Sequence, residues 1–187
     1  DGTESLASFA GAYSGKLAAA QAAQSREMAL AFNLPLLVHY AVDTEEQLNT
    51  GRSCNRQAVA MGKPTVLIEI GEWGKRDPAQ VDLAVRGILN VLRSQKMLPG
   101  VPLRNRRQPL EFQGTTSAST PQGGIWYPQV TTGTWVKKDT PLGVVRGYDG
   151  KELVRVTSPA EGMVLYMAAA PPVNDGQSVV TIALPRR

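Results

Sequence analysis

The sequence predicts an α/β part, extending to about Val101, followed by an all-β part. In the first part, helix-forming stretches alternate with short apolar runs in the order helix, strand, helix, strand, helix, which is typical of α/β folds. In the second part, short β-prone runs recur about every ten residues with glycine and proline turns between them. Between the two, the stretch from Arg104 to Gly123 is rich in Pro, Gly, Ser, Thr and Arg, which indicates a linker or long loop.

Composition narrows the class of protein. The chain has 187 residues with a hydrophobic fraction of 42%, enough for one large domain or two small ones. No apolar run approaches the roughly 20 residues of a membrane helix, and no basic-then-apolar leader opens the chain, so we expect no membrane association. The opening residue, Asp1, hints that the natural protein is longer.

Charge and cysteine content point away from nucleic acid and disulfides. The net charge is +4, and its only dense basic stretch is Arg104, Arg106 and Arg107, without the interleaved aromatics of a base-stacking surface. We favour a solvated linker over a phosphate-binding patch there, and expect no nucleic-acid partner. The single cysteine, Cys54, excludes an internal disulfide and is expected to be a small buried hydrophobe, which fits a reducing, cytoplasmic setting.

In the α/β part, the first element predicted is a helix. Leu6, Phe9, Tyr13 and Leu17 recur at helical spacing, and the alanine-rich stretch up to Gln24 favours a helix. A further apolar stretch ends at Asn33, and 36–38 form a short buried strand that ends at His39 and Tyr40. Ser53 is a candidate cap for a helix that runs to Met61.

The clearest strand predicted is Thr65 to Ile70. It is apolar on both faces, as a parallel or central strand would be. After it, Asp77 is a candidate N-cap with Pro78 at the first helical position. The stripe expected to face the core in this helix consists of Val81, Val85, Ile88, Leu89 and Leu92.

The second part contains a repeated pattern. Each half reads as a strand, a glycine turn and another strand, the first from Gly124 to Val145 and the second from Pro159 to Ile182. Two such halves resemble the biotinyl/lipoyl type of barrel-sandwich fold. We therefore predict two domains, 1–107 and 108–187. The predicted strands are 125–127, 135–136, 142–145, 153–157, 163–166 and 179–183.

One carboxylate stands out as a candidate catalytic group. The sequence contains no HExxH, P-loop or G-x-S-x-G pattern, and its one histidine and one cysteine cannot form a structural zinc site. Glu69, in contrast, closes an apolar strand, where a buried charge needs a partner or a use. We favour a functional carboxylate over a structural ion pair. The structural partner would be Arg56, Arg76 or Lys63.

These segments resemble the succinylglutamate desuccinylase/aspartoacylase family. The resemblance rests on the run from Gly62 to Gly71, the helix that begins at Asp77-Pro78, and the two-part β pattern from Gly124 to Ala183. It implies a zinc carboxypeptidase-like α/β domain, of which this chain is the C-terminal part, followed by the β domain. The predicted helix from Leu6 to Tyr13 is taken to follow the family's third zinc ligand.

The resemblance also implies a chemistry. Family members hydrolyse the amide of N-acyl amino acids with zinc held by two histidines and a glutamate, and Glu69 matches the glutamate that activates the zinc-bound water. The zinc ligands and the asparagine-arginine motif are expected upstream of Asp1, in a missing N-terminal segment or a companion fragment. Arg56 or Arg76 could bind a substrate carboxylate, although a surface charge is the commoner role. His39 is expected to be a core or edge histidine, not a replacement ligand.

Two other functions stay open. The chain could be a non-catalytic interaction fragment, and a homo-oligomer is compatible with either function. It could also be a biotin or lipoate carrier, but the segment from Arg146 to Glu152 lacks the Met-Lys-Met or Asp-Lys motif of carriers, so modification of Lys151 is not expected.

Overall fold

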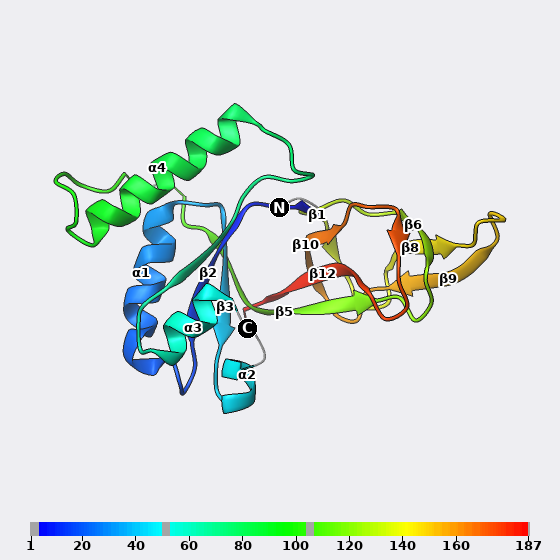
Figure 1. Ribbon diagram of the computed structural model, residues 1–187, viewed down its shortest axis with the longest axis horizontal. Helices are drawn as coiled ribbons and strands as arrows, with labels where there is room; N and C mark the ends of the chain where they lie inside the picture. The colour runs from blue at the N-terminus through cyan, green and yellow to red at the C-terminus, as the bar shows by residue number, and fades with distance from the viewer. Residues whose placement is uncertain (1–3, 50–52, 104–106, 187) are drawn as a thin grey trace. The chain divides into compact units, whose positions relative to one another are not determined.

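The computed structural model describes residues 4–49, 53–103 and 107–186 (Figure 1). The chain divides into two compact units, each made of segments that are separated in the sequence. The helical unit comprises Ser8–Ile70 and Arg76–Gly114, and the β unit comprises Asp1–Ala7, Gly71–Lys75 and Thr115–Arg187. The division into domains 1–107 and 108–187 remains a prediction from the sequence.

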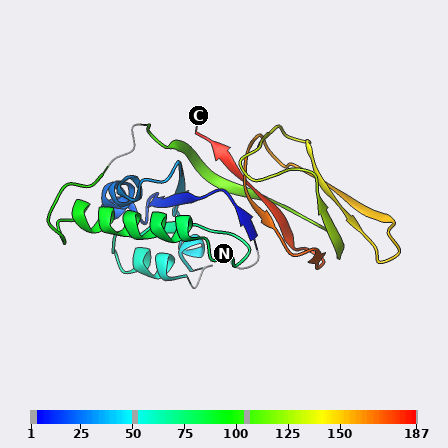
Figure 2. The ribbon, with the colours of Figure 1, turned by 90° about the horizontal axis from the view of Figure 1, so that it is seen from above.

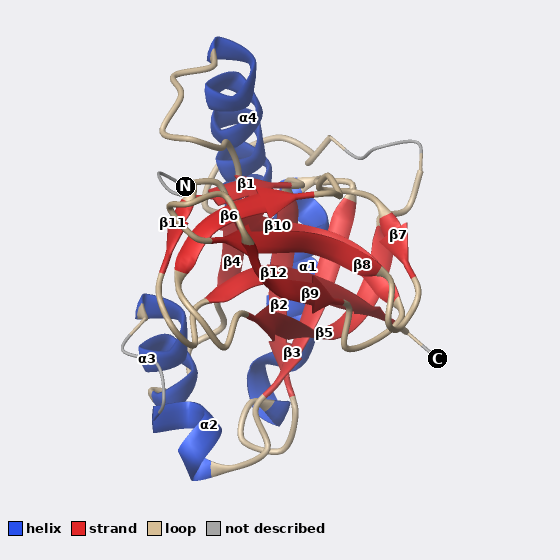
Figure 3. Ribbon diagram, turned by 90° about the vertical axis from the view of Figure 1, so that its right-hand side faces the viewer, coloured by secondary structure: helices blue, strands red, loops and turns tan. Residues whose placement is uncertain are grey.

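The helical unit is built on a mixed sheet with the strand order β4-β2-β3-β5. Strand β2 pairs in parallel with β3, β3 pairs in parallel with β5, and β4 runs antiparallel to β2. Figure 3 shows the helices of the chain in blue, and all those described belong to this unit. The elements are β2 (Phe9–Ser14), η1 (Ala19–Gln21), α1 (Ala22–Phe32), β3 (Leu36–Ala41), α2 (Glu45–Asn49), α3 (Cys54–Ala60), β4 (Val66–Glu69), α4 (Pro78–Ser94) and β5 (Leu110–Ser119), whose last five residues belong to the β unit.

The predicted opening helix is wrong. The segment instead forms the strands β1 (Glu4–Leu6) and β2, followed by η1 and α1. Five of the six residues of β2 are buried because elements cover both of its faces. A strand that is buried on both sides is apolar at nearly every position, so the spacing of Phe9, Tyr13 and Leu17 fits a helix equally well.

The two faces of this sheet have different partners. On one face, Ala10 and Ala12 of β2 pack with Ala29 and Phe32 of α1. On the other face, Tyr13 packs with Val59 of α3, Val42 and Ala18, with Tyr40 and Leu67 beside them. The alternation of side chains along a strand therefore places Val66 and Ile68 of β4 toward α1 and α4, and Leu67 and Glu69 toward α3.

Strand β4 differs from the prediction of a parallel or central strand. It is antiparallel to β2 and lies at the end of the strand order in the described sheet. All four of its residues are only partly buried. An apolar run on both faces arises here because α1 and α4 cover one side and the cluster around Tyr13 the other.

Helix α4 also packs differently from the prediction. Val81, Val85 and Ile88 of the predicted core stripe are 53%, 49% and 52% exposed. The helix instead lies against α1 (Figures 1 and 2) through a face that includes Gly87, where a Cβ atom would come within 2.3 Å of the Phe32 ring. Helical periodicity identifies apolar stripes, but the choice between two stripes follows from which one permits close approach to α1.

In α3, Ser53 forms the predicted N-cap, because its side chain accepts a hydrogen bond from the backbone N–H of Arg56. Cys54 is exposed at the first position of this helix, so the expected burial of this residue is wrong. None of the helices in the described part of the chain is long and apolar enough to cross a membrane.

The β unit consists of two sheets around one apolar core. The first contains β1, β10, β12 and the end of β5, with β7 paired to β10, and the second has the order β11-β6-β8-β9. Every strand predicted for the second part is present. The prediction of a linker at 104–123 is wrong, because this stretch contains all of β5, a strand rich in serine, threonine and glycine. The remaining elements are β6 (Gly124–Pro128), β7 (Trp135–Val136), β8 (Pro141–Arg146), β9 (Glu152–Thr157), β10 (Gly162–Ala168), β11 (Pro172–Val173) and β12 (Ser178–Pro185).

The two halves of the repeat exchange strands. The short strand β7 of the first half pairs with β10 of the second, and β11 of the second half pairs with β6 of the first. Backbone bonds reinforce the exchange, since Gly133 N–H donates to Val164 O at 2.8 Å and Trp126 N–H donates to Pro171 O at 2.6 Å. Neither half can therefore complete its sheet alone.

His39 belongs to an ion-pair network on the α1 face of the helical unit. Its Nε2 atom lies 2.8 Å from one carboxylate oxygen of Glu111 in β5, and Arg26 of α1 donates to the other at 2.6 Å. Burial by itself would raise the pKa of Glu111, but the hydrogen bonds from His39 and Arg26 lower it below its ordinary value. The predicted role of His39 as a structural residue is consistent with this geometry, and its partner was too far along the chain to be recognised.

We expect the Gly87→Ala substitution to destabilise the protein, although alanine favours helices by about 1 kcal/mol. The added methyl group would overlap the Phe32 ring, and overpacking costs about 1–3 kcal/mol. Denaturant unfolding of a double-mutant cycle with Phe32→Leu measures this. The penalty of Gly87→Ala should shrink in the Phe32→Leu background, and an unchanged penalty would contradict the packing of α4 on α1.

We expect Glu111→Gln to lower the free energy of unfolding at pH 7 by about 1–2 kcal/mol, since two hydrogen bonds to a charge are weakened. A lowered carboxyl pKa in the folded state stabilises the protein above the unfolded pKa of about 4.3, and this contribution is lost as the pH falls through the folded value. The difference in stability between wild type and variant should therefore shrink in urea melts as the pH is lowered from 7 toward the acid range. The control, Glu152→Gln, removes an exposed pair with Arg155 and should change stability by less than about 0.5 kcal/mol.

Candidate functional site

Glu69 lies at the end of β4, opposite Phe9 of β2. It shares the α3 side of the sheet with Leu67 and is half-buried. Burial raises the pKa of the Glu69 carboxyl. Within the described residues, no ion pair or hydrogen bond involves this side chain, so the structural ion pair considered from the sequence is not formed with Arg56, Arg76 or Lys63.

Arg56 projects from α3 over the same side of the sheet. The helix is held against β4 by Asn55, whose Nδ2 atom donates to Val66 O at 2.9 Å. The Nη1 atom of Arg56 is buried and has no hydrogen-bond partner among the residues that the structure describes. A buried guanidinium nitrogen without an acceptor lowers the stability of the folded state. The position of this atom therefore points to an acceptor outside the described residues.

Tyr13 is the third polar side chain on this face, and the sequence analysis missed it. Burial raises the pKa of the Tyr13 phenol, the charge of Arg56 lowers it and the charge of Glu69 raises it, so both charged groups act on this phenol. The Tyr13 ring contacts that of Tyr40 with centroids 5.8 Å apart. A correct strand assignment for 9–14 would have placed Tyr13 on the Glu69 face by its two-residue period.

The second candidate arginine is not part of this group. Arg76 is exposed just before α4, and among the described residues no interaction links it to Glu69. The structure therefore brings Glu69, Arg56 and Tyr13 to one face of the helical unit, and leaves Arg76 outside it.

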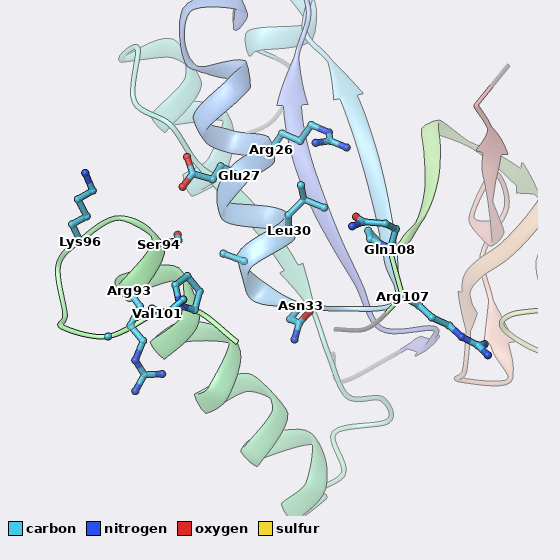
Figure 4. A pocket seen from close by; sticks show the side chains of 14 residues that line it. Arg26, Glu27, Leu30, Asn33, Arg93, Ser94, Lys96, Val101, Arg107 and Gln108 are labelled. Atoms are coloured by element: carbon cyan, nitrogen blue, oxygen red, sulfur yellow. The ribbon is translucent and has the colours of Figure 1, made fainter. Parts of the chain in front are cut away.

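A separate cavity of about 600 Å³ lies between α1, α4 and residues 100–102 and 107–109. Four cationic side chains line it, Arg26, Arg93, Lys96 and Arg107. Figure 4 shows that Arg93, Lys96 and Arg107 point in different directions and not toward a common centre. The cavity is also on the α1 side of the sheet, away from Glu69.

The structure also describes the surroundings of possible metal ligands and of Lys151. Residues 4–49, 53–103 and 107–186 contain no group of three His, Cys, Asp or Glu side chains that could hold a metal ion. Lys151 follows the turn of the β8–β9 hairpin, seen at the far end of β9 in Figure 1, and its ammonium pairs with Asp149 at 3.0 Å.

Comparisons with known proteins give a consistent fold. No protein-family model and no curated protein matches the sequence. Among solved structures, the ectoine utilization protein EutE (DoeB) of Ruegeria pomeroyi, in its product-bound form, is 20% identical with a TM-score of 0.83, over 97% of this chain and 55% of that one. A succinylglutamate desuccinylase/aspartoacylase of Rhodobacter sphaeroides is 19% identical with a TM-score of 0.81, over 99% and 56% of the two chains.

A third structure agrees with these two. An aspartoacylase family protein of Mesorhizobium loti is 18% identical with a TM-score of 0.70, over 99% of this chain and 54% of that one. The chain thus spans about half the length of each of these structures. The resemblance inferred from the sequence is confirmed at the level of the fold: the chain has the fold of the corresponding part of succinylglutamate desuccinylase/aspartoacylase family proteins.

Proposed function

We propose that this chain supplies the general base and a carboxylate-binding arginine to the hydrolysis of an N-acyl amino acid or related amide. The observation that supports this proposal most is that two side chains without partners lie on the same face of the sheet. Glu69 is a half-buried carboxylate without an ionic partner in the described residues, and Arg56 has a buried nitrogen without an acceptor. The solved structures of the same fold include a protein named succinylglutamate desuccinylase/aspartoacylase and an aspartoacylase family protein.

The chemistry of Glu69 follows from its protonation. A carboxylate accepts a proton from water as the water oxygen attacks the amide carbon. The carboxyl group then donates that proton to the leaving nitrogen as the C–N bond breaks. A raised pKa suits both steps, because proton transfer is most effective when the pKa of the group approaches the working pH.

Arg56 would bind the carboxylate of the amino-acid part of the substrate. A guanidinium matches the geometry of a carboxylate, and the bond is stronger in a site that excludes water. The buried Nη1 atom would gain the acceptor that it lacks. Arg76 remains a weaker candidate for the same role, since it is exposed.

Zinc is the cofactor that the resemblance implies. The residues described here include no ligand cluster for it, so zinc would need ligands from elsewhere, and we assign no step to it. The proposed partners are therefore a small N-acyl amino acid and the polypeptide, in the same or a companion chain, that completes the fold. The exchange of strands in the β unit supports a barrel-sandwich domain of the biotinyl/lipoyl type.

We expect the 187-residue chain to retain less than one equivalent of zinc after dialysis, because three ligands on one site are needed to hold the ion tightly. Elemental analysis of the purified chain measures this. Stoichiometric zinc would show that the chain contains a metal site that the proposal does not include.

Substitution of Glu69 by Gln tests the proposal. It keeps the shape of the side chain but cannot take a proton, so kcat should fall by at least about 100-fold. The assay uses N-acetyl and N-succinyl amino acids and the chain together with the polypeptide that completes the fold. The acid limb of kcat/KM should lie above the ordinary glutamate pKa of about 4.3, because burial raises the pKa of Glu69.

The melting temperature of the same variant distinguishes the catalytic proposal from the alternative of a non-catalytic interaction fragment. A carboxyl whose folded pKa is raised favours folding less as the pH rises above 4.3, so Glu69→Gln should leave Tm unchanged or higher at pH 7. A purely structural Glu69 would instead lower Tm on substitution and leave kcat of the folded protein unchanged. Glu152→Gln, which removes an exposed ion pair with Arg155 in the β unit, is the matched control and should change neither quantity.

A further inference from the structure

A chain of two hydrogen bonds holds the backbone of Tyr13 in place. Its N–H donates to Ser25 Oγ at 2.8 Å, and that hydroxyl donates to Thr65 O at 2.6 Å. Ser25 is fully buried in α1 and thereby links β2 to the start of β4. The position of the Tyr13 side chain relative to β4 is therefore set by hydrogen bonds as well as by strand pairing.

The Tyr13 ring is also held in place, while its hydroxyl group is not used. The residue is 6% exposed, and the ring packs on Tyr40. Tyr40 can approach because Gly11, between Phe9 and Tyr13 on this face, has no side chain: a Cβ atom there would lie 2.8 Å from the Tyr40 ring. In the described part of the chain, no residue forms a hydrogen bond with the Tyr13 hydroxyl.

Arg56 faces the same place. Tyr13 packs with Val59, and Arg56 lies one turn before Val59 on the same face of α3. Its Nη1 atom is buried and lacks an acceptor. The structure thus holds two hydrogen-bond donors, one neutral and one cationic, on one side of the sheet, and the described residues supply an acceptor for neither.

The separation between Tyr13 and Glu69 indicates which part of a substrate each group would contact. Glu69 is opposite Phe9, and Tyr13 lies four residues further along β2, which corresponds to about 13 Å between backbone positions. Long side chains shorten this separation at their tips. An extended acylated amino acid could place its amide at Glu69 and its carboxylate between Arg56 and Tyr13.

We propose that the Tyr13 hydroxyl is the second donor to the substrate carboxylate, and that with Arg56 it makes the site select a carboxylate over a carboxamide. The inference rests on the proposed function. A carboxylate has two charged acceptor oxygens, one for each donor. A carboxamide has one neutral acceptor oxygen, and its NH2 group finds no acceptor on a guanidinium. Discrimination of this kind is large when the site's polar groups would be left unpaired.

Equilibrium binding tests this without turnover. The probes are N-acetyl-L-alanine and N-acetyl-L-alaninamide, which differ only in the carboxylate, titrated by NMR into the 187-residue chain. The acid should bind at least about 10-fold more tightly than the amide. Tyr13→Phe, which keeps the ring, should weaken binding of the acid about 10-fold, as expected for a hydrogen bond to a charge, and leave the amide unchanged.

Tyr40→Phe is the matched control, because it removes a hydroxyl from the adjacent ring on the same face. It should leave both affinities unchanged. Absence of a preference for the acid, an unchanged affinity in Tyr13→Phe or an equal loss in Tyr40→Phe would each overturn the inference. Failure of the hydrolytic function is seen separately, as retained kcat in Glu69→Gln, and does not alter these affinities.

Discussion

Burial of β2 on both faces is the constraint on which the helical unit depends. Small side chains at Ala10 and Ala12 let α1 approach one face, and the absence of a side chain at Gly11 lets Tyr40 approach the other. The strand pairs with β3 on one edge and β4 on the other. Packing on both faces and pairing on both edges fix the position of each side chain that we place in the candidate site.

The candidate site is costly for stability. Within the described residues, Glu69 is partly removed from water without an ionic partner, and the buried Nη1 atom of Arg56 has no hydrogen-bond acceptor. Each such group costs on the order of 1–3 kcal/mol. Stable packing around Tyr13, Val59 and Val42 offsets this cost, and the same groups become favourable when a ligand supplies their complements.

The β unit obtains its stability in another way. Its two halves are related by a repeat, and each half pairs one short strand with the other half. Trp126, Leu142, Val164 and Ile182 meet in a single apolar core between the sheets. Because neither half encloses a core alone, the two have to fold together, whatever the unit binds.

The sequence by itself determined the strands of the β unit, the caps of α3 and α4, and Glu69 as the unusual carboxylate, since local turn chemistry and alternation specify them. Only the tertiary structure decided that 9–14 is a strand, that α4 packs through Gly87, and that Glu111 is the partner of His39. The physical reason is that a segment buried on all sides shows no alternation of polar and apolar residues from which its secondary structure could be predicted. The electrostatic effects of Arg56 and Glu69 on Tyr13 join residues more than forty positions apart. They follow from strand pairing and helix packing, which no local pattern records.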